Sequence, residues 1–304
     1  MRSVAGSFEK ALGAVRFLEV EDLYGGSGLR VVFIDSGCGR DLPLKDCINL
    51  SNDSTVDTED HGAHVHAILA SMLPDAEIIL IKVPDPLPDN VLITALNEAL
   101  KLSPHVISLS ITSEVPSDGS DPSSTYVNHV AEKSLVAVSA GNGGPRMMSV
   151  GSPAVAVNAL TVGAADVRGR LWRRSSRGPT LDGRWKPNVV APTGFIPPAS
   201  KERKEVWGTS FSTPIAAAVA APLVKKLGSP ETAARILELT ACSVDLNTAP
   251  PPTLTGLRKA SLIRKLMQNW PRLYDPRNFA GMGMVNAEAA LRLAEKLRRS
   301  ISTL

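Results

Sequence analysis

The chain has 304 residues, of which 43% are hydrophobic and 21% charged, and its formal net charge at pH 7 is +3. This length and composition allow a large hydrophobic core and exclude a wholly disordered chain. No apolar stretch approaches the ~20 residues that cross a bilayer, and the net charge is too small to indicate nucleic-acid binding. We therefore expect a globular protein that binds neither a membrane nor a nucleic acid.

The cysteines and the N-terminal residues indicate the cellular compartment of the protein. Three cysteines, Cys38, Cys47 and Cys242, cannot all pair within one chain. The first fifteen residues contain no apolar segment of the kind found in secretion signals. These features predict a cytoplasmic, reduced protein with free thiols, and a Cys38–Cys47 bridge is the alternative.

Apolar, β-branched runs alternate with helix-patterned stretches through most of the chain. This alternation predicts a three-layer α/β fold, with a mainly parallel sheet and helices on both faces. The predicted strands are 29–35, 76–83, 105–110, 134–140 and 159–164, and the predicted helices are 61–72, 90–101, 122–133, 214–227, 230–242 and 286–298. Residues 245–280 are rich in proline, basic and aromatic residues and are too short to own a core, so we expect one domain, 1–304, with an excursion there.

Polar residues directly follow several predicted strands. Asp35 ends the first strand, Ser110 ends the third, and Asn142 lies in a glycine-rich turn after the fourth. Because ligands of open α/β sheets bind at the carboxyl ends of strands, these residues should converge on one cleft. Taken singly, two of them have another explanation: Asp35 could bind a ribose or a phosphate-bound metal, and Asn142 could simply tolerate a left-handed turn.

Four hydroxyl side chains precede a proline in the segment WGTSFSTPIAAAVAAP, residues 207–222. Thr213 and Pro214 suit the N-cap and first position of a buried helix. The alternative is that one hydroxyl is a nucleophile, which needs a base, a carboxylate that orients the base, and donors for an oxyanion. The chain offers a strand-end aspartate, a histidine at a predicted helix start and an amide in a turn.

In this order, these segments resemble the subtilisin-like serine proteases, the subtilase family. The resemblance covers residues from about 20 to 298 and rests on VVFIDSGCG (31–39), HGAHVHAIL (61–69), VISLSI (106–111), SAGNGG (139–144), SSRGPTLDGRWKPNVVAPTG (175–194), GTSFSTPIAAAVAA (208–221) and GMGMVNAEAAL (281–291). It implies a subtilisin-like fold and a serine endopeptidase that acts on peptides or proteins.

The resemblance also implies the catalytic roles. Ser210 would be the nucleophile, and His61 the general base and then the general acid. Asp35 would hold His61 in the right tautomer. The side-chain amide of Asn142 and the backbone N–H of Ser210 would donate to the oxyanion, which the start of a helix also favours.

The same resemblance locates the substrate. A peptide would add as a strand beside residues 108–112, and the turn at 139–141 would form a wall of the first specificity pocket. Gly151 would be the floor of that pocket and leave room for a large apolar side chain, although Thr112, in place of the usual glycine, would crowd a wall. The expected substrate-binding residues are Ser108, Leu109, Ser110, Ser139, Ala140, Gly141 and Gly151.

Three features depart from the family. His66 stands where a small residue is common; it either packs in the core or joins His61 and His64 in a metal site, for which the helical spacing is poor. The usual calcium-binding loop before strand 76–83 is absent, so we expect no metal and no obligatory cofactor, with calcium possible elsewhere. Few residues precede the first matching segment, and no propeptide is recognisable.

Two other functional classes stay open. A peptide-binding pseudoenzyme would use the same groove without turnover. A metal-dependent hydrolase would use the histidines of the segment HGAHVH. The presence of every residue type that acyl transfer needs favours the protease.

Overall fold

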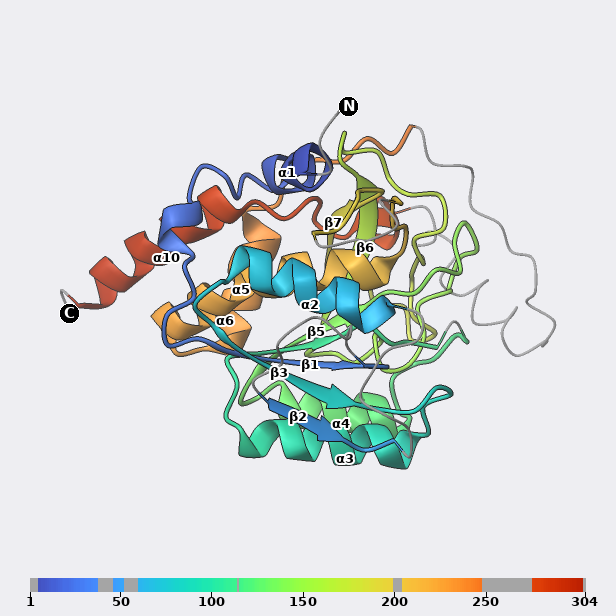
Figure 1. The fold of residues 1–304 in the computed structure, drawn as a ribbon. Helices are drawn as coiled ribbons and strands as arrows, with labels where there is room; N and C mark the ends of the chain where they lie inside the picture. The colour runs from blue at the N-terminus through green and yellow to red at the C-terminus, as the bar shows by residue number, and fades with distance from the viewer. Residues whose placement is uncertain are drawn as a thin grey trace.

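A computed structural model describes residues 5–37, 46–51, 60–113, 115–198, 204–247 and 275–302. At its centre lies a seven-stranded sheet in the order β2-β3-β1-β4-β5-β6-β7, in which every pair of neighbours is parallel. The helices α2, α5 and α6 cover one face, and α3 and α4 cover the other (Figure 1). The predicted three-layer α/β fold is confirmed.

All five predicted strands are present within one or two residues of the predicted ends. Two further strands, β2 and β7, were not predicted. β7 contains Pro192, which has no N–H to donate and argues against a central strand. β7 lies at the edge of the sheet, where β6 is its neighbouring strand and an isolated bridge joins Val190 to Met284. The strands are β1 (Arg30–Asp35), β2 (Asp46–Asn49), β3 (Glu77–Lys82), β4 (Val106–Leu109), β5 (Leu135–Ser139), β6 (Leu160–Asp166) and β7 (Val189–Thr193).

The six predicted helices are also present, with differences at their ends. α4 and α6 both start at a proline whose preceding residue caps the helix, Asp121 and Ser229 respectively. The helices are α1 (Ala5–Ala14), α2 (His61–Met72), α3 (Asp89–Lys101), α4 (Pro122–Val130), α5 (Thr209–Leu227), α6 (Pro230–Leu239), α9 (Arg277–Ala280) and α10 (Ala287–Ser302), with a short 3-10 helix, η1 (Glu21–Leu23). Of these, α1, α9 and η1 were not predicted.

The start of α5 differs from its prediction. The N-cap is Gly208, so Thr213 and Pro214 lie inside the helix, and the Thr213 hydroxyl donates to the Thr209 carbonyl at 2.8 Å. A proline cannot donate to the carbonyl four residues earlier, here that of Ser210. The Ser110 hydroxyl donates to that carbonyl instead, at 2.9 Å. The predicted capping pair is therefore wrong, and the proline leaves a helix carbonyl free for a contact with the sheet.

Two hydrophobic clusters lie on opposite faces of the sheet. One gathers side chains from α1, α2, α5, α6 and α10, and the other from α3 and α4. Every residue of α5 from Phe211 to Ala221 is buried. A helix that is apolar on all sides belongs at the centre of a domain, and α5 occupies that place.

Several features fall only partly within the described residues. Residues 248–274 of the expected excursion, and Cys38, lie outside them. Cys47 and Cys242 carry free thiols.

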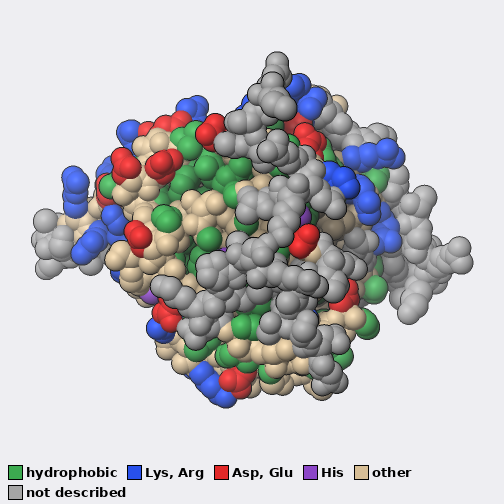
Figure 2. All heavy atoms as spheres, in the orientation of Figure 1, with side chains coloured by type: hydrophobic (Ala, Val, Ile, Leu, Met, Phe, Trp, Pro, Cys, Tyr) green, Lys and Arg blue, Asp and Glu red, His purple; other side chains and the backbone are tan. Residues whose placement is uncertain are grey.

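No described helix has both the length and the hydropathy that crossing a bilayer requires. On the face seen in Figure 2, basic and acidic side chains are interspersed, as the small net charge leads one to expect.

Candidate active site

The candidate catalytic residues gather at the carboxyl edge of the sheet. Asp35 is the last residue of β1, Ser110 follows β4, and Asn142 lies in the turn after β5. These three strands are neighbours in the order β1-β4-β5. The first turns of α2 and α5 bring His61 and Ser210 to the same edge. The predicted convergence of strand-end polar residues is therefore present.

His61 and Asp35 are hydrogen-bonded. The Nδ1 atom of His61 lies 2.8 Å from the Oδ1 atom of Asp35, which is only 1% exposed. The same carboxylate oxygen accepts the backbone N–H of Ser36 at 2.8 Å. Because a carboxylate only accepts hydrogen bonds, the neutral His61 ring that this contact favours is the one with its proton on Nδ1. This is the tautomer that a general base requires.

Gly62 allows α2 to begin close to β1. A Cβ atom at this position would lie 1.9 Å from the Gly37 carbonyl oxygen and 3.0 Å from Asp35 Oδ1. No side chain fits there, so the chain can bring the residue before it, His61, against the strand-end carboxylate only with glycine at position 62.

Ser210 is tied to the end of β4 by two hydrogen bonds. Its hydroxyl donates to the Ser110 carbonyl at 3.2 Å, and its own carbonyl accepts the Ser110 hydroxyl at 2.9 Å. Its backbone N–H belongs to the first turn of α5, where amides have no partner within the helix. The next residue, Phe211, lies with its ring centroid 5.3 Å from that of His61. Ser210 thus lies between the strand end and α2.

Asn142 is oriented by the residue before Ser210. Its Oδ1 atom accepts the backbone N–H of Thr209 at 3.1 Å and the Thr209 hydroxyl at 3.2 Å. That hydroxyl also accepts the backbone N–H of Gly141 at 3.1 Å. Since the amide oxygen is held by the start of α5, the NH2 group of Asn142 is the end that faces away from Thr209. An amide held in this way is suited to donate to an anion beside Ser210.

The expected peptide-binding strand needs correction. Ser108 and Leu109 lie inside β4, are buried, and are paired with β1 on one side and β5 on the other. Their backbone groups are therefore not open to a peptide. Ser110 is also buried, and its carbonyl accepts the Ser210 hydroxyl. The open stretch is Ile111 and Thr112, which are half-buried and with whose backbone no described residue pairs.

The expected pocket residues are also placed differently. Ser139 and Ala140 are buried, whereas Gly141 has a φ of +99° and faces Thr112. A Cβ atom on Gly151 would lie 2.1 Å from the Ser113 carbonyl oxygen. Backbone atoms therefore occupy the Cβ position of Gly151, and its role as a pocket floor stays a prediction.

The three histidines of α2 contact different neighbours. His61 bonds Asp35, His64 lies 6.1 Å from the Phe211 ring, and His66 is buried 5.8 Å from the Phe33 ring. Burial lowers the pKa of His66 below its usual value. Within the described part of the chain, no group of three or more metal-binding side chains comes together. The core position of His66 matches the first of its two predicted roles.

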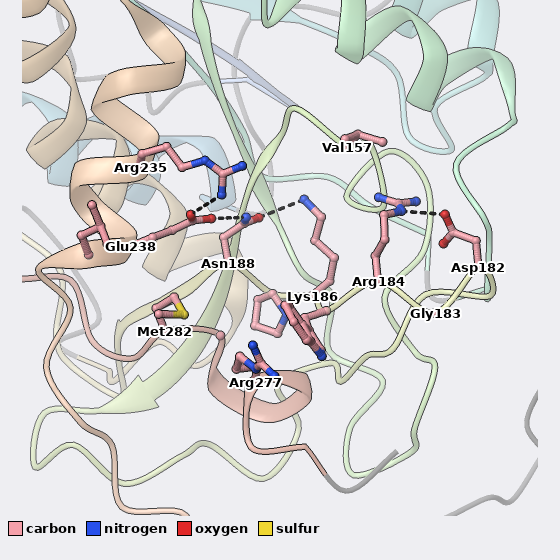
Figure 3. Close-up of a pocket in the computed structure, with 14 residues that line it drawn as sticks. Val157, Asp182, Gly183, Arg184, Lys186, Asn188, Arg235, Glu238, Arg277 and Met282 are labelled. Atoms are coloured by element: carbon pink, nitrogen blue, oxygen red, sulfur yellow. Dashed lines mark hydrogen bonds and ion pairs between the residues drawn. The ribbon is translucent and has the colours of Figure 1, made fainter. Parts of the chain in front are cut away.

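A separate cavity of about 770 Å³ lies at the amino edge of the sheet, beside the starts of β6 and β7 (Figure 3). Lys186 is buried beneath it and donates to the Ala159 carbonyl at 2.8 Å and to Asn188 Oδ1 at 2.9 Å. Asn188 in turn donates to Glu238, which also accepts from Arg235. Burial lowers the pKa of Lys186 to about 7. This network lies at the edge of the sheet opposite the candidate active site, and no sequence pattern predicted it.

Comparison with protein families matches residues 39–271 to the subtilase family, Peptidase S8. The matched range holds every residue of the candidate site except Asp35. The chain belongs to the subtilase family.

This subtilase is similar over most of its length to two bacterial relatives. It is 25% identical to serine protease AprX of Bacillus subtilis, over 86% of this chain and 66% of AprX, and 27% identical to subtilisin BL of Lederbergia lenta, over 88% and 92%. A 154-residue stretch is 37% identical to pyrolysin of Pyrococcus furiosus, covering 39% of this chain and 11% of pyrolysin. The chain thus spans less than two thirds of pyrolysin and AprX.

Solved structures support the fold. The protease domain of PatA matches with a TM-score of 0.65 and 20% identity, over 90% of this chain and 97% of that domain. The prenylagaramide maturation protease PagA matches with a TM-score of 0.65 and 19% identity, over 97% and 99%. At these identities the likeness shows that the subtilase has a subtilisin-like fold.

Proposed function

We propose that this subtilase is a serine endopeptidase with Ser210 as nucleophile, His61 as general base and Asp35 as its orienting carboxylate. The observation that carries the proposal is the buried Asp35–His61 hydrogen bond, set against the helix start that bears Ser210. This pair orients a histidine at the edge of the sheet where the Ser210 hydroxyl also lies, and an oriented base of this kind is what activates a weak nucleophile.

In the proposed reaction, the Ser210 hydroxyl turns from the Ser110 carbonyl toward Nε2 of His61. His61 takes the hydroxyl proton as the serine oxygen bonds to the peptide carbonyl carbon, and it returns that proton to the leaving amine. A water molecule, deprotonated by His61, then hydrolyses the acyl-enzyme. Asp35 stabilises the histidinium in both steps.

The Asn142 amide and the Ser210 backbone N–H would stabilise the oxyanion of each tetrahedral intermediate. Loss of one such donor typically lowers kcat by about 10²–10³-fold. The fixed orientation of Asn142, through Thr209, supports this role because a preorganised donor costs no rearrangement during the reaction.

The proposed substrate is a peptide or protein in extended conformation. It would add as a strand along Ile111 and Thr112, the open stretch after β4, with its end at the Ser110 carbonyl. We expect no obligatory calcium or other metal. The odd number of cysteines supports a reducing, intracellular setting.

Replacement of the nucleophile tests the function. Ser210→Ala should retain the thermal midpoint and lose at least about 10³-fold of the casein-cleaving activity. Ser27→Ala, an exposed serine at the opposite edge of the sheet, is the matched control and should keep full activity. Full cleavage by Ser210→Ala would overturn the proposal.

Two reagents separate the alternatives. An alkyl fluorophosphonate should label Ser210 and abolish activity, whereas a chelator should leave activity intact. Loss of activity with the chelator alone would indicate a metal-dependent hydrolase. Peptide binding with neither labelling nor turnover would indicate a pseudoenzyme.

A further inference from the structure

Thr112 lies two residues after Ser110, whose carbonyl accepts the hydroxyl of the candidate nucleophile. Its Cγ2 methyl lies 3.2 Å from where a Cβ of Gly141 would be. On its other side, its hydroxyl donates to the Ser152 carbonyl at 3.2 Å. Thr112 therefore spans the gap between the turn after β5 and the segment around residue 151.

The backbone after Thr112 packs against the segment around residue 151. The Ser113 N–H donates to the Ser152 carbonyl at 2.8 Å, and Pro116 forms an antiparallel bridge with Gly151. The carbonyl oxygens of Ser113 and Val115 lie 2.1 and 2.6 Å from where a Cβ of Gly151 would be. Backbone oxygens thus fill the position that a side chain at residue 151 would need.

The position of the attacked carbonyl follows from the site. Its carbon must reach the Ser210 hydroxyl while its oxygen faces the Asn142 amide. In the proposed binding mode, the preceding chain runs beside the open stretch at Ile111 and Thr112. The side chain of the residue that supplies this carbonyl then points between Thr112 and Gly141, because these two residues flank the space next to Ser210 and Asn142.

We propose that Thr112 restricts the residue on the acyl side of the cleaved bond to glycine, alanine or serine; this rests on the proposed peptidase function. A methyl-sized side chain fits beside the Thr112 methyl and the Gly141 backbone. An aromatic or long aliphatic side chain would have to displace Thr112 and break its hydrogen bond to Ser152. Thr112 is thus a specificity-determining residue, and the substrates are segments with a small residue before the cleaved bond.

The test compares two anilide peptides, Ala-Ala-Pro-Ala and Ala-Ala-Pro-Phe, which differ only in the residue on the acyl side. The wild-type protein should have a kcat/KM for the alanine peptide about 10–100-fold above that for the phenylalanine peptide. Thr112→Gly removes the methyl and the hydroxyl, and should shift the ratio toward phenylalanine by at least about tenfold. Thr112→Val keeps the shape without the hydroxyl and should keep the alanine preference.

Three outcomes would count against the proposal. Equal or faster wild-type cleavage of the phenylalanine peptide, or an unchanged ratio in Thr112→Gly, would overturn it while the peptidase function stands. An alkyl fluorophosphonate carries no amino-acid side chain and tests Ser210 by itself. If Ser210 is not labelled and neither peptide is cleaved, the peptidase function fails, and the restriction fails with it.

Discussion

A side chain at Gly62 would displace the candidate base beside it. Gly62→Ala puts a Cβ 1.9 Å from the Gly37 carbonyl oxygen, so the start of α2 must move and carry His61 away from Asp35. We expect a loss of about 1–3 kcal/mol in the free energy of unfolding and a fall in kcat of at least about tenfold.

The measurements are thermal unfolding, in the Ser210→Ala background to prevent self-cleavage, and peptide hydrolysis with Ser210 intact. Gly13→Ala is the matched control because the nearest atom to a Cβ there, Leu18 Cδ1, is 3.9 Å away within helix α1. The control should be as stable as the wild type or slightly more stable. A Gly62→Ala variant as stable and active as this control would contradict the steric argument.

The sequence predicted the residues that meet at the site better than the shape around them. Asp35 and Asn142 could be found because polar residues at strand ends meet at one sheet edge. The close approach of backbone to Gly151 could not be predicted, because it depends on the position of the Ser113 carbonyl. Every residue type has a backbone carbonyl, so the sequence does not indicate where that carbonyl lies. Thr112 was the one visible sign of a crowded pocket.

At the scale of elements, the loop before β7 contains a buried lysine, Lys186. Burial lowers the pKa of Lys186 to about 7 from its usual 10.5. Between pH 7 and pH 10.5 the unfolded chain therefore holds a proton that the folded chain has released. The free energy of unfolding consequently rises with pH through this window, and this contribution is lost as the pH falls to 7.

Lys186→Met should remove the pH dependence that Lys186 contributes to the free energy of unfolding. The stability of the wild type relative to Lys186→Met should rise between pH 7 and pH 10 by at most about 1.4 kcal/mol per pH unit, measured by urea unfolding. Lys101→Met, at an exposed position of α3, controls for the loss of a positive charge. A difference between wild type and Lys186→Met that does not change with pH would contradict the lowered pKa.

Elements were predicted best where hydrophobic patterning is strong. The five internal strands are apolar runs, and they were found. The strands at the two edges, β2 and β7, were missed because one reads DCIN and the other contains Pro192. The start of α5 was misplaced because Pro214 usually opens a helix, whereas here the Ser110 hydroxyl compensates for its missing N–H.

At the scale of the whole molecule, no bound metal is expected to be needed for stability. Residues 73–76 join α2 directly to β3, which leaves no room for a loop of carboxylate ligands there. Addition of a chelator to the Ser210→Ala protein should leave Tm unchanged in a calorimetric scan. A fall in Tm that added calcium restores would show a structural ion site elsewhere.

The sheet itself was predictable, but its strand order was not. Alternating strands and helices indicate a parallel sheet with two covered faces. Which strands become neighbours depends on contacts between distant segments, as in the pairing of β1 with both β3 and β4. The two hydrophobic clusters follow from this order, since each helix joins the face to which its connection leads.

The burial of α5 determines how the protein unfolds and loses its activity. Because the helix that carries Ser210 is enclosed from Phe211 to Ala221, it cannot open to solvent unless the surrounding core opens with it. Its amide hydrogens should exchange with solvent only when the whole domain unfolds. Peptide-bond cleavage would then disappear in the same cooperative transition as the fold, so that partly unfolded molecules cannot digest their neighbours.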